Sequence, residues 1–245
     1  MTPPPRPVTV EVCVEDVAGV RAAQRAGADR VELCADLRQG GTTPSIGTVA
    51  TALSVLDRTG LQVLLRPRGG DFVHDADEVA AMLADVAAVR ALPARVPVGF
   101  VLGTLTPDSL VDAEVTARLV AACGDAPVTF HRAFDATPDL AAALETLVDL
   151  EIGRVLTGGG PGTASEGAAR LAALHEQARG RITILAAGGI RPGNVRTLLR
   201  DTGVHEVHGR APAEAGGRTV TSEAVARALV EECRAAASAP MTTGE

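Results

Sequence analysis

The sequence of 245 residues contains no tryptophan and no tyrosine, and it has four phenylalanines. It therefore has few side chains that can stack on sugars or nucleobases. Acidic residues outnumber basic ones, which leaves a formal net charge of −7 and a pI near 5.3. Nucleic acids and anionic membranes select a basic surface, so we expect neither as a partner. A metal ion or a small molecule is the expected ligand.

Cysteine is scarce, and no apolar run is long enough for a signal peptide or a membrane-spanning helix. The four cysteines all lie within apolar runs: Cys13, Cys34, Cys123 and Cys233. Four thiols are too few for a disulfide scaffold in a chain of this length, and they suit the reducing cytoplasm. The Pro-rich start, residues 1–7, and the tail, residues 238–245, are predicted to be disordered.

What the sequence has in abundance is apolar residues, 46% in all, in a regular alternation of β-branched runs and Ala-rich windows. The expected strands are residues 8–14, 30–35, 61–66, 97–103, 127–131, 154–157, 181–187 and 204–208. The expected helices are residues 16–26, 44–59, 75–91, 108–122, 139–150, 165–179, 193–201 and 221–237. Such alternation predicts parallel strands, and the length predicts one domain, residues 8–237, of the α/β class. We predict a single (β/α)8 TIM-type barrel, with an open doubly wound sheet as the alternative.

Polar residues alternate with apolar ones along these strands, so each strand has a helix-facing and a barrel-facing set. If the apolar set packs against the helices, the polar set points into the barrel. We expect these residues at the barrel mouth: Glu11, Glu32, Arg66, His131, Thr157, Glu206 and His208. So many charges are costly in a packed interior, which favours a functional site.

In residues 63–72 an apolar strand is followed directly by a loop that contains Arg66, Arg68 and Asp71. Proline and paired glycines end the strand there, so the arginines lie at its carboxyl end, where barrels bind ligands. A guanidinium suits a carboxylate or a phosphate. Alternatively, the arginines only pair with neighbouring acids.

Glu11 and Glu32 lie on neighbouring strands, where two carboxylates can divide into an acid and a base or hold a cation. The alternative is a carboxylate–arginine network that satisfies itself. His131 follows the fifth strand, with Arg132 and Asp135 on the loop beside it, and is a candidate general acid or base or a hydrogen-bonded core residue.

Two glycine-rich turns follow later strands, one after Thr157 and one at Gly188 and Gly189. Loops after the seventh and eighth strands of barrels often bind phosphate through backbone N–H groups, which favours Gly188 and Gly189 as a phosphate loop. Tight turns between strands and helices also use glycine. The glycines therefore indicate either a phosphate loop or an ordinary turn.

Cys13 and Cys34 each stand two residues beyond a glutamate on neighbouring strands. Two thiolates are ligands that Cu(I) prefers. Barrel strands are staggered, however, and a buried cysteine ordinarily packs as a small apolar residue, so the spacing leaves both interpretations open.

Several strings together resemble the copper homeostasis family called CutC, from about residue 8 to 211. They are VEVC at 10–13, GADRVELC at 27–34, GGTTPS at 40–45, RPRGGDF at 66–72, VTFHRAFD at 128–135 and RVLT at 154–157. The resemblance implies a TIM-type barrel, a cytoplasmic location, self-association as a homo-oligomer, and copper handling with Cu(I) bound at Cys13 and Cys34. The chain departs from the family pattern at Gly158-Gly159 and at Gly209-Arg210, and Arg210 favours an anionic ligand.

Two functions follow. The primary prediction is a copper homeostasis protein that binds Cu(I) through Cys13 and Cys34. The alternative is a small-molecule enzyme, a hydrolase, lyase or isomerase with a sugar-like or anionic substrate, in which an arginine anchors the substrate and a glutamate with His131 moves protons. The ligand-binding candidates of that second function are Arg68, Asp71, Arg132, Asp135, Thr157, Gly188, Gly189 and His208.

Overall fold

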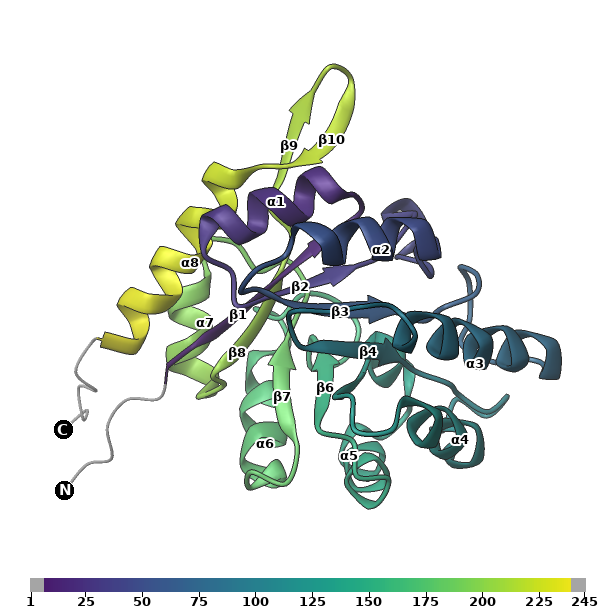
Figure 1. Cartoon of the computed structure of the whole chain (residues 1–245). Coiled ribbons are helices and arrows are strands. Elements are labelled where there is room, and N and C mark those ends of the chain that lie inside the picture. The colour runs from purple at the N-terminus through teal and green to yellow at the C-terminus, as the bar shows by residue number, and fades with distance from the viewer. Residues whose placement is uncertain (1–6, 239–245) are drawn as a thin grey trace, which may run out of the picture.

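Eight parallel strands pair in chain order in the computed structural model, which describes residues 7–238, and the last strand pairs with the first to close a barrel (Figure 1). The strands are β1 Thr9–Val14, β2 Arg30–Leu33, β3 Gly60–Leu64, β4 Val98–Leu102, β5 Val128–Phe130, β6 Arg154–Thr157, β7 Thr183–Ala186 and β8 Glu206–Gly209. The helices are α1 Val17–Ala26, α2 Ile46–Val55, α3 Ala76–Arg90, α4 Ala113–Cys123, α5 Leu140–Asp149, α6 Ala168–Ala178, α7 Val195–Thr202 and α8 Glu223–Ser238. Two short 3-10 helices, η1 Leu37–Gln39 and η2 Arg132–Ala136, follow β2 and β5.

The predicted (β/α)8 barrel is confirmed, and the open-sheet alternative is excluded because β1 pairs with β8 from Thr9 and Glu206 to Val12 and Gly209. The predicted disordered ends lie outside the described residues, apart from residues 7 and 238. Among residues 7–238, no helix combines the length and the apolar character needed to cross a membrane.

Most helices begin with a side-chain cap. Asp16 caps α1, and Asp75 forms a capping box with Glu78 at the start of α3. The helix predicted from residue 108 begins later, because Asp108 belongs to a turn and α4 starts at Ala113 with Asp112 as its cap. Helix α6 follows Gly167 without a side-chain cap, so the predicted start at residue 165 was also too early.

One element was not predicted, an antiparallel hairpin of β9 Pro212–Ala215 and β10 Arg218–Thr221 between the barrel and α8. It extends beyond the barrel next to α1 (Figure 1). Its turn consists of Gly216 and Gly217, both with positive φ, which is the conformation that a two-residue hairpin loop requires. The glycine pair was the available signal.

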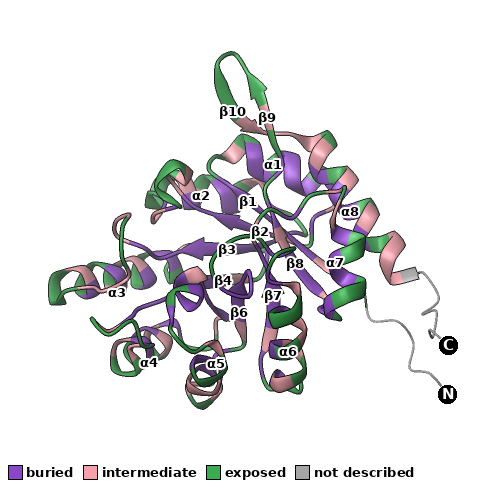
Figure 2. Cartoon of the chain, turned by 180° about the vertical axis from the view of Figure 1, so that it is seen from behind, coloured by how far each residue is buried: buried purple, intermediate pink, exposed green. Residues whose placement is uncertain are grey.

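Most of the apolar core lies between the strands and the helices, whose outer faces are exposed (Figure 2). Its largest fully buried side chains include Phe100, Phe130 and Phe134. Of the described residues, two small groups form apolar clusters inside the barrel, one around Leu64 and Val101 and one around Leu156 and Leu185. Polar side chains fill much of the remaining interior, and they form the candidate site.

Candidate functional site

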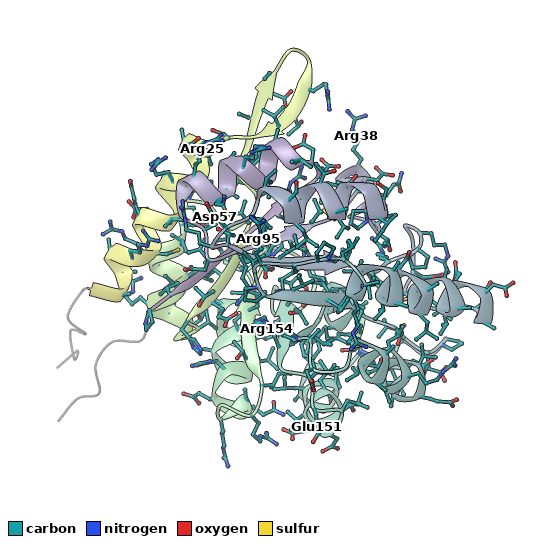
Figure 3. The ribbon with its side chains drawn as sticks, viewed as in Figure 1. Arg25, Arg38, Asp57, Arg95, Glu151 and Arg154 are labelled. Atoms are coloured by element: carbon teal, nitrogen blue, oxygen red, sulfur yellow. The ribbon has the colours of Figure 1, made fainter. Side chains whose placement is uncertain are left out.

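Two acidic and two basic side chains meet inside the barrel at the amino-terminal ends of the strands. Arg30 begins β2 and donates to Glu11 Oε2 at 2.9 Å and to Glu206 Oε2 at 2.6 Å. Arg154, labelled in Figure 3, begins β6 and donates to the same Glu206 oxygen at 2.6 Å. We call these four side chains the base network. Each charge in it contacts an opposite charge, as a buried ionic group requires.

The base network corrects the expected places of Glu11 and Glu206, which the alternation of β1 and β8 predicted at the mouth, since neither lines the mouth cavity. Glu206 stands beside Thr9, the first residue of β1, and is therefore at the opposite end of the strand from the mouth. Alternation gives the face that a residue occupies but not its depth in the barrel. Arg30 and Arg154 were missed, although Arg30 shares its inward face with Glu32, two residues further along β2.

Cys13 and Cys34 meet above this network. Their Sγ atoms are 3.5 Å apart, and the Cys34 thiol also donates to the Val14 carbonyl at 3.4 Å. Both residues are buried. The register explains the contact, because Cys13 stands beside Glu32 on the neighbouring strand and Cys34 lies two residues further toward the mouth. The thiol pair that the sequence left open is therefore present as a contact.

His208 lies between the two glutamates. Its Nδ1 is 2.9 Å from Glu11 Oε1, and its Nε2 is 3.7 Å from Glu32 Oε2. One ligand atom from each of Cys13, Glu32 and His208 lies within 4.8 Å of the others. In many metal sites a histidine ligand binds the metal with one ring nitrogen and donates a hydrogen bond from the other to a carboxylate. Glu11 contacts His208 in this way, and the other nitrogen of His208 faces Glu32.

These groups shift one another's pKa values. Burial alone would raise the pKa of Glu11, but the hydrogen bond from His208 and the charge of Arg30 lower it to about 2. Burial raises the pKa of Glu32 despite the nearby imidazole. Burial opposes the charge on His208, yet Glu32 and its other partners raise its pKa well above the usual value. The contact with Cys34, together with burial, raises the pKa of Cys13, which is a thiol at neutral pH.

A cavity of about 270 Å³, the mouth cavity, opens above the thiols at the carboxyl ends of the strands. Its walls include Leu64 and Phe72. The thiol and charged or polar side chains that line it are Cys13, Glu32, Cys34, Arg66, His131, Arg132, His208 and Arg210. Seven of the sequence candidates thus share one cavity, together with Arg210.

Two of these residues have a nitrogen without a partner in the described part of the chain. His131 accepts from the Ala133 N–H at Nδ1, at 3.1 Å, and its buried Nε2 has no partner. Burial and the charge of Arg66 lower the pKa of His131 to about 3, so the ring is neutral. Arg66 donates to the carbonyls of Gln39, Gly41 and Gly70, while its buried Nε is left without a partner.

Other predicted residues lie elsewhere. Arg68 pairs with Asp71 at 2.9 Å and with Glu78 at 2.6 Å, at the start of α3, and neither Arg68 nor Asp71 lines the mouth cavity. Thr157 follows the inward-facing Leu156 and so faces out of the barrel, where its hydroxyl donates to Asp135.

Asp135 has a structural set of contacts. It accepts from Arg132 Nε at 2.6 Å and from the backbone N–H groups of Gly158 and Gly160. The carboxylate thus holds the loop after β6 against η2. Gly188 and Gly189 line a second cavity, which adjoins the mouth cavity.

Comparison with known proteins identifies the family of the chain. The CutC family model matches residues 8–213. A CutC family protein of Mesorhizobium japonicum is 49% identical over 199 residues, which cover 81% of this chain and 76% of that protein. The human copper homeostasis protein cutC homolog is 43% identical over 199 residues, which cover 81% of this chain and 71% of that protein. A solved structure, CutC from Streptococcus agalactiae, matches with a TM-score of 0.77 at 33% identity and covers 82% of this chain and 98% of that one.

Proposed function

Because the chain belongs to the CutC family, we propose that it takes part in copper homeostasis by binding Cu(I) through Cys13 and Cys34 at the barrel mouth. The observation that carries the proposal is the 3.5 Å contact between the two Sγ atoms. Two thiols in contact at the floor of an open cavity form a soft donor set, which fits Cu(I) better than a hard cation. His208, on the same floor, is a candidate third donor.

The ion would be cargo that the protein buffers or delivers, and the thiols must lose protons to bind it. Because the pKa of Cys13 is raised well above its usual value, the proton must leave as copper enters. Copper affinity therefore increases with pH across the neutral range. The mouth cavity opens this site to a copper donor or acceptor.

An anaerobic Cu(I) competition titration tests the proposal. The wild type is expected to bind about one ion per chain, and the Cys13→Ser/Cys34→Ser variant is expected to lose that binding. Cys123→Ser/Cys233→Ser is the matched control, because it removes the two other buried thiols, which lie on α4 and α8. Copper binding that is indifferent to Cys13 and Cys34 would show that they are core residues only.

The proposal includes two properties that belong with this family assignment. A cytoplasmic location would keep both thiols reduced and available. Self-association as a homo-oligomer is measured by sedimentation of the full chain, and the copper titration is then expressed per protomer.

A second candidate function is supported by groups that copper binding does not use. Arg66 and His131 line the mouth cavity, and each has a buried nitrogen without a partner among residues 7–238. Unpaired buried donors are costly unless a ligand satisfies them. We infer a small-molecule enzyme of the proton-transfer type, in which Glu32 and His131 are the acid–base candidates. The sequence has no lysine, so a lysine Schiff base has no part in it.

Turnover and binding screens with sugar-like compounds and small organic acids test this second function. His131→Gln is expected to abolish the binding of any ligand that the screen finds, while leaving Cu(I) binding unchanged because it removes no thiol. Absence of a ligand and of turnover across both panels would remove the support for an enzyme.

A further inference from the structure

A second cavity, of about 580 Å³, lies between the loops that follow β7 and β8. We call it the β7–β8 cavity. Three arginines line it, Arg132, Arg191 and Arg210, and no aspartate or glutamate is among its lining residues. The whole chain has a formal charge of −7. A cavity with three cationic side chains and no acidic one is therefore a local exception in an acidic protein, and it attracts anions.

Two of the three arginines are available to a ligand. Arg191 forms no ion pair with any residue between 7 and 238, and Arg210 forms a long ion pair with Glu15, at 4.0 Å. Arg132, in contrast, is fixed by Asp135 at 2.6 Å and by the Gly162 carbonyl at 3.1 Å. The cavity thus combines one positioned guanidinium, Arg132, with Arg191, which forms no ion pair in the described part of the chain, and Arg210, whose ion pair is long.

The floor of the cavity is a preformed turn. Gly188 and Gly189 have φ values of 105° and 70°, a conformation that favours glycine. Asn194 holds the turn, because its side chain donates to the Gly189 carbonyl at 2.9 Å and accepts from the Arg191 N–H at 2.8 Å. The Gly189 N–H makes no hydrogen bond within the described part of the chain. A rigid turn with a free N–H beside arginines suits a tetrahedral oxyanion.

The β7–β8 cavity is continuous with the mouth cavity, because Arg132, His208 and Arg210 line both. We infer that the β7–β8 cavity binds the phosphate group of a small phosphorylated molecule whose other end reaches the mouth cavity. Arg191, Arg210 and the Gly189 N–H contact the phosphate, and the guanidinium fork matches its oxygens. Neither Cys13 nor Cys34 lines the β7–β8 cavity, although His208, the candidate third copper donor, lines both cavities.

Calorimetric titration at constant ionic strength, in a buffer free of phosphate and sulfate, tests the inference. The probes are inorganic phosphate, glycerol 3-phosphate and uncharged glycerol. We expect saturable binding of both phosphates by the wild type and none of glycerol. Arg191→Gln/Arg210→Gln is expected to weaken the binding of both phosphates at least about tenfold, because two charge-assisted contacts are lost.

The matched control is Arg95→Gln/Arg118→Gln, which removes the same charge from two exposed arginines that do not line the β7–β8 cavity. Its phosphate binding is expected to stay within about twofold of the wild type, since distant surface charges are screened. Absence of saturable phosphate binding by the wild type, or equal weakening in both double variants, would overturn the inference. Cu(I) binding is expected to be unchanged in both, which separates this result from that of the copper proposal.

Discussion

The base network and the mouth cavity differ in how completely their polar side chains are paired. In the base network Arg30 and Arg154 share Glu206, and Arg30 also reaches Glu11, so each charge is compensated. At the mouth, the buried Nε2 of His131 and Nε of Arg66 have no partner among the described residues.

This difference indicates that the base network supports the fold, whereas the mouth cavity is suited to bind a ligand. A buried ionic network that compensates itself has no need of a ligand and fills the narrow interior that the small apolar clusters leave. Buried groups without partners, next to an open cavity and a thiol pair, are groups that a ligand can satisfy. The same kinds of residue therefore have different roles at the two ends, and the following predictions test that division.

The largest expected effect is on stability, from Glu206→Gln. It leaves Arg30 with one acid and Arg154 with none, and we expect the free energy of unfolding to fall by about 3–5 kcal/mol in urea denaturation. Glu151→Gln, at an exposed position labelled in Figure 3, is the control and should change little. A loss below about 1 kcal/mol for Glu206→Gln would contradict a supporting role for the base network.

A smaller effect is expected from His131, through pH. Its folded pKa of about 3 lies below its usual value of 6.5, so the unfolded chain takes up a proton that the folded chain refuses as the pH falls through this interval. At pH 5 this costs the wild type about 2 kcal/mol of stability relative to pH 7. His131→Gln should lose correspondingly less stability between these two pH values. Equal losses in both proteins would show that His131 titrates normally.

The smallest effect is expected from Arg68→Gln. Arg68 contacts Asp71 and Glu78 at an exposed helix start and does not line the mouth cavity. We expect a change in stability smaller than the two above, because surface ion pairs contribute little, and unchanged Cu(I) binding. Reduced binding of a small ligand in this variant would instead support Arg68 as an anchor, as the sequence suggested.

The barrel was predictable because β-branched strands and Ala-rich helices alternate along the whole chain. The inward faces of Glu11, Glu32 and His208 followed from the alternation within strands. The contact of Cys13 with Cys34 was not predictable, since it depends on the register of β1 against β2 in the closed barrel.

The sequence also could not predict how deep in the barrel an inward-facing residue lies. Glu206 and His208 share one face of a four-residue strand, yet Glu206 contacts Arg30 and Arg154 while His208 lines the mouth cavity. A long side chain such as Arg154 reaches across the interior and contacts a residue of another strand, here Glu206 of β8. The free nitrogens of Arg66 and His131 likewise depend on which carbonyls and N–H groups the loops bring to them.

The most direct test of the division between base and mouth is urea unfolding under anaerobic conditions with and without Cu(I). A ligand stabilises only a folded protein that binds it. We predict that Glu206→Gln is less stable than the wild type but gains as much stability from copper. Cys13→Ser/Cys34→Ser is predicted to begin near the wild type and to gain none. A copper effect that survives loss of the thiols, or disappears with Glu206, would contradict the account.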